Sequence, residues 1–339
     1  MNLENAKRFF ESTTGKKSSE FITLAQSGSA RVNFLAAAGD GKYIVTYNEN
    51  IRENEAFLYY SRIFSENKLN TPHIYHVSED RKMYIQEFLG EHTLSDTIAK
   101  EGLSEPVKTL VKQTLEKLYE LQKRTLHKID YKKTFEYERY DELPVIHDLY
   151  YFKNFIADVL ELEYHKAALL KEFKKIAAQI ESLEPKGLMI RDFQARNIMV
   201  NKHNEVAFID YQSAMEGPLM YDVISFLFQA KANFPEDFKN EMLEYYISQF
   251  NDRDQETQLR FSVKPLQMMR FLQVLGAYGF RGLIQRKHHF IASLEIGITN
   301  LTEFAETWKG MKDYPELKTV IEQLNKENTK LKIDKILNH

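Results

Sequence analysis

The spacing of apolar residues along the chain changes near residue 90. Before this point they gather in short runs, such as residues 21–24 and 32–35, with small and polar residues between the runs. Runs of this kind predict β-strands, and these two predict a hairpin around a glycine-containing turn. Beyond residue 90 apolar residues recur every three or four positions, the spacing of one face of an α-helix. The pattern predicts an α+β protein in which the strands come first.

The expected elements can be placed by residue number. Before residue 90 we expect strands at 43–47, 74–77 and 83–89 and a helix at 53–66. After residue 90 we expect helical segments at 104–126, 146–180, 218–230, 237–250, 263–286 and 315–337. A chain of 339 residues is longer than one hydrophobic core usually serves. We therefore expect two lobes, residues 1–89 and residues 90–339.

Composition excludes several classes of protein. Lys and Arg together number 46 against 49 Asp and Glu, and the net charge of −3 offers no general attraction to nucleic acid or to an anionic membrane. The absence of cysteine excludes disulfides, thiolate metal sites and a cysteine nucleophile. The start lacks a signal-peptide pattern, and no run approaches 18 apolar residues. We expect a cytoplasmic protein without an obligate protein partner.

A polar loop followed by a hairpin predicts a metal site. Asn197 precedes the apolar run 198–200, and Asp210 follows the run 206–209, with a polar turn between the runs. Because hairpin strands are antiparallel, the residue entering the first strand and the residue leaving the second should lie side by side. Their oxygen atoms suit Mg²⁺, which usually takes one or two carboxylates from the protein and its other ligands from phosphates and water.

Asp192 lies in the loop five residues before Asn197 and can accept a proton from an attacking hydroxyl group. Arg191 and Gln194 in the same loop are counted with it as catalytic candidates. An isolated loop Asp is more often a turn or capping residue. The joint spacing of Asp192, Asn197 and Asp210 favours phosphoryl transfer, because it is the order of catalytic and metal-binding residues in protein-kinase-like enzymes.

The motif residues resemble a known family. Residues 191–197, 208–212 and 221–223 are similar to the aminoglycoside phosphotransferase and choline kinase superfamily, and within it to bacterial kinases that phosphorylate N-acetylmuramate or N-acetylglucosamine at the anomeric hydroxyl. The resemblance implies a bilobal protein-kinase-like fold, with a small antiparallel sheet in the N-lobe and a mostly helical C-lobe. It also implies ATP and Mg²⁺, with Asp192 as the catalytic base, Asn197 and Asp210 as metal ligands, and Asp222 bracing the catalytic loop.

The nucleotide site is expected in the N-lobe. Ser27, Gly28 and Ser29 form a loop whose backbone N–H groups can approach phosphates, although one glycine between two serines is more often a plain turn. By analogy with kinases, the adenine is expected near Glu87 and Phe88, at the end of the last strand.

The lysine that kinases carry inside the third strand is missing here. Arg31 and Lys42 are the nearest replacements, with Arg31 favoured because it would stand over the phosphates, and a solvated role is as good an interpretation for either. Glu53 or Glu55 can face that cation, although acidic residues also suit a first helical turn through the helix dipole alone. Two further departures from the kinase pattern are Ile190 in place of His and Tyr211-Gln212 in place of Phe-Gly.

The acceptor is expected to be a small molecule. The short span from Asp210 to Asp222 has no room for the long activation segment of a protein kinase. Arg270, Gln273 and Arg281 fall on one stripe of a helix, where they either line an acceptor pocket or form a solvated face. Gly276, Gly279 and Gly282 lie on other faces and are suited to close helix packing. A basic stripe in the pocket favours a neutral or anionic sugar.

Two alternatives remain open at this stage. The missing strand lysine would allow a pseudokinase that binds nucleotide or a protein partner without catalysis, whereas the intact Asp192, Asn197 and Asp210 favour an enzyme. The acceptor can also be an aminoglycoside or a choline-like alcohol instead of a sugar.

Overall fold

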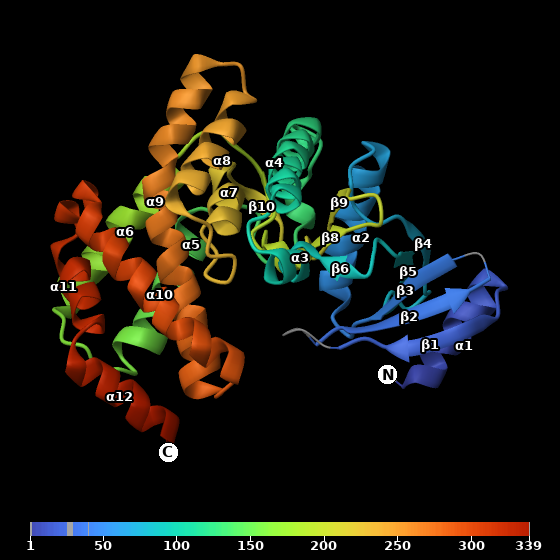
Figure 1. The fold of residues 1–339 in the computed structure, drawn as a ribbon, viewed down its shortest axis with the longest axis horizontal. Helices are drawn as coiled ribbons and strands as arrows, with labels where there is room; N and C mark the ends of the chain where they lie inside the picture. The colour runs from blue at the N-terminus through green and yellow to red at the C-terminus, as the bar shows by residue number, and fades with distance from the viewer. Residues whose placement is uncertain (1, 26–29, 40, 339) are drawn as a thin grey trace. The chain divides into compact units, whose positions relative to one another are not determined.

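The computed structural model describes residues 2–25, 30–39 and 41–338, and it confirms the α+β class (Figure 1). The chain forms two compact units. The first comprises Met1–Glu138 and Ile190–Met215, and the second comprises Arg139–Met189 and Glu216–His339. The lobe boundary expected between residues 89 and 90 stays a prediction. Within the described residues, no helix is long and apolar enough to cross a membrane.

The first unit contains a five-stranded antiparallel sheet with the strand order β1-β2-β3-β5-β4. Its strands are β1 (Ser18–Thr23), β2 (Val32–Ala38), β3 (Gly41–Tyr47), β4 (Ile74–Val77) and β5 (Met83–Glu87). The hairpin predicted around the glycine-containing turn is formed by β1 and β2. Each expected strand of this region is therefore present.

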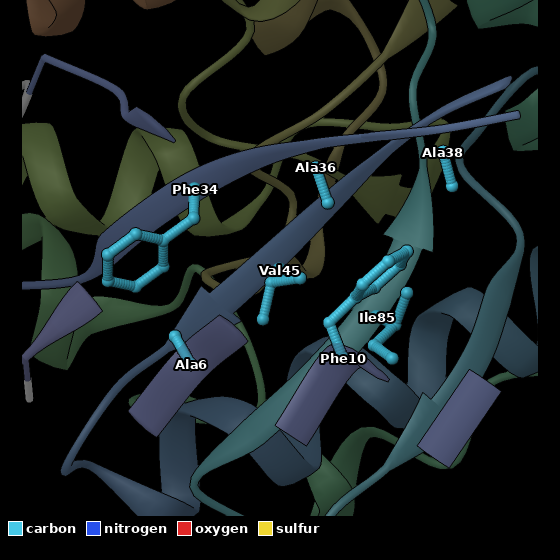
Figure 2. Packing of buried hydrophobic residues seen from close by; sticks show 7 residues of the cluster. All are labelled: Ala6, Phe10, Phe34, Ala36, Ala38, Val45 and Ile85. Atoms are coloured by element: carbon cyan, nitrogen blue, oxygen red, sulfur yellow. The ribbon is translucent and has the colours of Figure 1, made fainter. Parts of the chain in front are cut away.

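A helix that the sequence analysis did not predict, α1 (Leu3–Thr14), covers one face of this sheet. Its buried residues Ala6 and Phe10 lie four positions apart, on one side of the helix. Figure 2 shows them gathered with Phe34, Val45 and Ile85 of the strands. The remaining members of this core are Ala36 and Ala38.

The predicted helix at 53–66 is α2 (Ile51–Glu66), which begins after the capping residue Asn50. Its Phe57 ring stacks on Tyr84 of β5 at a centroid distance of 5.2 Å. Because neighbouring strand residues point to opposite faces, Tyr84 lies on the face opposite Ile85 and the α1 core. The two helices therefore pack on opposite faces of the sheet.

The first unit is completed by α3 (Leu94–Glu101), α4 (Glu105–Thr125) and a three-stranded sheet of order β6-β8-β9. In this sheet β8 (Ile198–Val200) and β9 (Val206–Phe208) form the predicted hairpin, and β6 (His92–Thr93) pairs with β8. Gly90 leads into β6 with φ at 150°. A Cβ atom on it would lie 2.7 Å from the carbonyl oxygen of Val200, so the chain passes β8 at a distance that only glycine permits.

The second unit is mostly helical. Its elements are α5 (Glu142–Phe152), α6 (Lys166–Glu181), β7 (Lys186–Met189), β10 (Met215–Pro218), α7 (Met220–Leu227), α8 (Glu236–Ser248), α9 (Arg253–Tyr278), α10 (His288–Thr307), α11 (Pro315–Leu324) and α12 (Glu327–Asn338). The expected helix at 146–180 is divided, because α5 ends in a π-helical turn (Lys153–Ala157) and Glu161 then adopts a left-handed conformation with φ at 48°. The helices α3 and α10 were not predicted, and the single helix expected at 315–337 is divided into α11 and α12.

Glycines allow α9 and its π-helical extension (Gly279–Ile284) to pack closely on α5 and on the π-helical turn that follows it. A Cβ atom on Gly276 would lie 2.7 Å from the backbone nitrogen of Phe152, and one on Gly279 would lie 2.3 Å from the carbonyl oxygen of Phe155. Both neighbours are backbone atoms and cannot move aside as a flexible side chain can. The prediction that these glycines permit close helix packing is confirmed.

We expect Gly90→Ala to destabilise the first unit by about 2 kcal/mol or more, because it adds both backbone strain and a steric conflict with Val200. Gly39→Ala is the control, since a Cβ atom there meets nothing within 4 Å, and it should change the free energy of unfolding by less than about 0.5 kcal/mol. Urea unfolding of both variants measures the difference. Equal midpoints for the two variants would contradict the assigned contact.

Candidate active site

The β8–β9 hairpin brings Asn197 and Asp210 together. Ile198 pairs with Phe208, and the backbone N–H of Ile209 donates to the carbonyl oxygen of Asn197 at 3.0 Å. The Asn197 side-chain nitrogen lies 3.4 Å from the Asp210 carboxylate. Asp210 itself has a left-handed backbone with φ at 65°, which a residue leaving a strand at a sharp bend adopts. The convergence inferred from the hairpin is present in the structure.

Asp192 is tied to the same pair of residues. The side-chain nitrogen of Asn197 donates to the carbonyl oxygen of Asp192 at 2.8 Å, so one amide links the loop to the hairpin. Phe193 and Ala195 are buried, and the Phe193 ring packs edge-on against Phe208 at 4.9 Å. These buried neighbours hold the loop, while Asp192 itself is half-buried.

The other two candidates in the catalytic loop lie on either side of Asp192. Arg191 is half-buried with φ at 72°, and Gln194, also half-buried, accepts a hydrogen bond from the Asn197 backbone N–H through its own carbonyl oxygen at 2.8 Å. Their part in catalysis stays a prediction.

Arg31 forms two ion pairs in this region. Its Nη2 atom lies 2.5 Å from Oδ1 of Asp210, and its Nε atom lies 3.2 Å from Oε1 of Glu53. Only 11% of the Arg31 side chain is exposed. Burial by itself lowers the pKa of Arg31, but the negative charges of Asp210 and Glu53 outweigh it and raise the pKa above the ordinary value. The guanidinium is therefore a permanent positive charge beside the candidate metal ligand.

Of the two acidic residues considered at the start of α2, Glu53 is the one that faces Arg31. Its second carboxylate oxygen accepts a hydrogen bond from the side chain of Asn48 at 2.8 Å. Asn48 is buried, so this partner holds Glu53 in place. Glu55 instead pairs with Arg81 at 2.5 Å, on the exposed side of the helix.

Lys42 lies at the other end of β3 from the segment that carries Arg31. Arg31 immediately precedes Val32, which pairs with Tyr47, whereas Lys42 pairs with Ala37. These positions are five ladder steps apart, or roughly 17 Å at the usual rise of a strand. Lys42 is partly exposed and its ammonium group lies 2.5 Å from Glu91. Of the two cations considered, Arg31 alone contacts the candidate metal ligand.

Tyr211 anchors the segment after Asp210 to α2. Its ring stacks on Phe57 at 4.8 Å and packs edge-on against Phe64 at 5.0 Å. Its hydroxyl group shares a hydrogen bond of 2.7 Å with Ser61. Burial raises the pKa of Tyr211, so the phenol stays neutral. Sequence reasoning noted Tyr211 only as a departure from the kinase pattern, although a large aromatic residue beside the candidate metal ligand was a signal of this anchor.

A second hydrogen bond joins the same segments, because the Tyr60 hydroxyl group donates to the carbonyl oxygen of Ala214 at 2.7 Å. The helix that carries Glu53 and the chain that carries Asp210 are thus joined through a buried aromatic cluster. The distance between the two carboxylates that Arg31 bridges depends on this packing.

The expected adenine position is only partly free. The backbone N–H of Glu87 donates to the carbonyl oxygen of His73 at 2.8 Å, and the Glu87 side chain accepts from the His73 N–H at 3.1 Å. Phe88 is half-buried and its ring lies 5.4 Å from the Lys42 ammonium group. The predicted phosphate loop, Ser27, Gly28 and Ser29, lies outside the described residues.

The predicted acceptor residues belong to the second unit. Arg270 is buried, donates to the Gln273 side chain and lies 5.9 Å from the centre of the Tyr221 ring. Arg281 is half-buried and lies 5.0 Å from the centre of the Phe290 ring. Asp222 is fully buried in the first turn of α7, and its expected bracing of the catalytic loop stays a prediction.

The donor set can be compared with the needs of a metal ion. Within the described part of the chain, no group of three or more His, Cys, Asp or Glu side chains is arranged to hold a metal. One carboxylate and one amide oxygen nevertheless suit Mg²⁺, which keeps several water or phosphate ligands. Asn197 uses its nitrogen as a donor to Asp192, which leaves its side-chain oxygen as the candidate ligand beside Asp210. The residues present therefore fit a magnesium–nucleotide complex.

The sequence model described as "Phosphotransferase enzyme family" matches residues 22–261. An N-acetylmuramate/N-acetylglucosamine kinase of Neisseria meningitidis serogroup B is 22% identical over 245 residues, which cover 71% of this chain and 70% of that protein.

Solved structures show the same fold. The choline kinase LicA from Streptococcus pneumoniae matches with a TM-score of 0.60 at 13% identity, covering 88% of this chain and 98% of the other. A thermostable mutant of aminoglycoside phosphotransferase APH(4)-Ia, in a ternary complex with ADP and hygromycin B, matches with a TM-score of 0.59 at 16% identity, covering 90% and 99%.

The Tyr211 anchor can be tested by removing its hydroxyl group alone. We expect Tyr211→Phe to lower the free energy of unfolding by about 1 kcal/mol, because the ring contacts remain and one buried hydrogen bond is lost. Tyr211→Ala should cost about 3–5 kcal/mol, since it leaves a cavity against Phe57 and Phe64. Tyr75→Phe, at an exposed position in β4, is the control. Denaturant titration would disprove the anchor if all three variants unfolded alike.

Proposed function

The chain belongs to the phosphotransferase enzyme family, and from that premise we propose that it transfers the γ-phosphoryl group of ATP to a hydroxyl group of a sugar or amino sugar. The observation that carries the proposal is the connection between Asp192, Asn197 and Asp210. The side-chain amide of Asn197 contacts both the carbonyl oxygen of Asp192 and the carboxylate of Asp210. A nucleotide-binding scaffold needs no such set.

In the proposed reaction Asp192 accepts the proton of the acceptor hydroxyl. The acceptor oxygen then forms a bond to the γ-phosphorus, and the bond from that phosphorus to the bridging oxygen of ADP breaks. Asn197 and Asp210 would hold Mg²⁺, which neutralises charge on the phosphates when it is bound. Positioning and electrostatic stabilisation supply most of the catalysis in reactions of this kind.

Arg31 weakens the argument for a pseudokinase. That alternative rested on the missing strand lysine, and the structure has a buried guanidinium beside Asp210. We propose that this guanidinium serves the nucleotide phosphates, with the adenine near Glu87 and Phe88. A chain that had lost catalysis would have no need to keep a cation there.

A small acceptor is supported by the chain that follows the metal ligand. β10 begins at Met215 and α7 at Met220, so regular structure resumes soon after Asp210. No segment of the length that binds a protein substrate intervenes. We place the acceptor contacts at Arg270, Gln273 and Arg281, as the helical stripe suggested.

A sugar is favoured over a polycation because Arg281 would repel positive charge. The Neisseria protein, named as a kinase of two N-acetylated amino sugars, supports the same choice.

Asp192→Asn should lower kcat by about 10²- to 10⁴-fold, the usual contribution of a positioned general base, and should leave nucleotide affinity nearly unchanged. Asp334→Asn, at an exposed position in α12, is the matched control and should retain full activity. Steady-state kinetics with the best acceptor, together with nucleotide titration, measures both quantities. Turnover near that of the unmodified protein in the Asp192 variant would refute the assigned base.

The acceptor class can be decided with N-acetylmuramate, N-acetylglucosamine, kanamycin and choline. We expect turnover of the sugars, and a KM for the carboxylate-bearing N-acetylmuramate that rises about 10- to 100-fold in Arg281→Gln, because a charge-assisted hydrogen bond is lost. The KM for neutral N-acetylglucosamine should change less. Arg260→Gln is the control on the same helix, since Arg260 pairs with Glu244 and Glu256. Saturable phosphorylation of kanamycin or choline alone would overturn the substrate class.

A further inference from the structure

One cation touches both the anchored glutamate of α2 and the candidate metal ligand. We propose, on the basis of the proposed function, that Arg31 replaces the strand lysine and has two successive partners. Its first partner is Asp210, whose Oδ1 atom lies 2.5 Å from Nη2 of Arg31. When the nucleotide binds, the guanidinium remains on Glu53 and passes from Asp210 to the phosphates, so that Asp210 becomes available to the metal ion.

The first argument is competition for one carboxylate. Oδ1 of Asp210 accepts hydrogen bonds from Nη2 of Arg31 at 2.5 Å and from the side-chain nitrogen of Gln212 at 3.2 Å. Oδ2 faces the Asn197 nitrogen at 3.4 Å. A divalent cation placed at this carboxylate would also be repelled by the guanidinium beside it. Mg²⁺ without nucleotide therefore binds Asp210 poorly until another anion forms an ion pair with the Arg31 guanidinium.

The second argument is the difference between the two ends of the bridge. Glu53 is 16% exposed and is held from behind by the buried Asn48. Asp210 is 32% exposed, so the end of the bridge at Asp210 is the more accessible to solvent and ligands. Because Glu53 is the less exposed carboxylate and is itself held by Asn48, we take the Glu53 ion pair as the fixed end and the shorter Asp210 contact as the exchangeable end. Asn48 and Glu53 are therefore positioning residues for Arg31.

The third argument is the shape of the guanidinium. Arg31 uses Nε for Glu53 and Nη2 for Asp210, which are separate nitrogens of one planar group. After Nη2 leaves Asp210, it can contact a phosphate oxygen while Nε keeps its partner. A lysine ammonium group is a compact point charge and cannot contact two partners in fixed directions equally well. This accounts for arginine, rather than lysine, at the position.

Arg31 lies directly beside the sheet and beside a buried tyrosine. Arg31 directly precedes Val32, whose pairing with Tyr47 begins the β2–β3 ladder. Tyr84, which is fully buried, lies close enough to influence Arg31 electrostatically, and burial raises the pKa of this tyrosine to about 12, partly opposed by Arg31. The phenol is therefore neutral, so the positive charge of Arg31 is balanced by the carboxylates of Asp210 and Glu53.

The test is a binding measurement that needs no turnover. Mn²⁺ serves as the probe, and its affinity is measured by electron paramagnetic resonance without nucleotide. We expect Arg31→Gln to bind Mn²⁺ about tenfold more tightly than the unmodified protein, because the competing cation is gone. The same variant should bind ATP at least about tenfold more weakly in the presence of Mg²⁺. The Mn²⁺ and ATP affinities of Arg31→Lys should lie between those of the unmodified protein and those of Arg31→Gln.

Two further variants complete the experiment. Lys117→Gln removes a charge from a surface pair with Glu120 on α4 and should change neither affinity. Asp210→Asn in the Arg31→Gln background should abolish the gained Mn²⁺ affinity, which assigns the gain to this carboxylate. Thermal unfolding verifies that each variant is folded.

Unchanged or weaker Mn²⁺ binding in folded Arg31→Gln would overturn the inference, as would unchanged ATP affinity. If Arg31→Gln does not fold, Arg31→Lys carries the decision, and Mn²⁺ and ATP affinities equal to those of the unmodified protein would overturn the inference. Failure of the proposed function has a different signature, because a protein that turns over no acceptor would still show the opposite shifts in Mn²⁺ and ATP affinity.

Discussion

The candidate active site depends on the antiparallel pairing of β8 and β9. A ladder that pairs Ile198 with Phe208 leaves Asn197 and Asp210 at the same end of the hairpin. The hydrogen bond from Ile209 to Asn197 extends this pairing by one residue toward the site. The Asn197 amide then reaches the Asp192 loop. Short-range backbone pairing thus sets the positions of all three groups that we propose for phosphoryl transfer.

Hydrophobic packing positions Glu53 relative to Asp210, which the β8–β9 hairpin alone does not do. Glu53 and Asp210 are far apart in sequence, and a buried aromatic cluster of Phe57, Phe64 and Tyr211 brings their segments together. Ring stacking and the shared hydrogen bond with Ser61 leave little freedom to this contact. The electrostatic bridge through Arg31 is possible because apolar burial has already set the spacing of the two carboxylates.

The second unit illustrates a different constraint. Gly276 and Gly279 let α9 and its extension approach the backbone at Phe152 and Phe155 so closely that no side chain fits between them. The adjoining π-helical turns interrupt regular helix geometry, a feature often found at functional sites. Arg281 lies within one of these turns, and this placement is consistent with the acceptor role proposed for it.

By itself the sequence determined the α+β class, the strands of the first sheet and the hairpin, because strand periodicity and turn residues are local signals. It also determined that Asn197 and Asp210 converge, since a hairpin relates distant positions by simple pairing. It did not reveal α1, α3, α10 or the division of the 315–337 segment. It also missed the division of the 146–180 segment, where a π-helical turn and a left-handed residue interrupt the helix despite the helical periodicity. Only the tertiary structure decided that Arg31, not Lys42, stands beside Asp210, and that Glu53, not Glu55, holds it. Ion pairs between residues distant in sequence depend on how whole elements pack, and no local pattern encodes that arrangement.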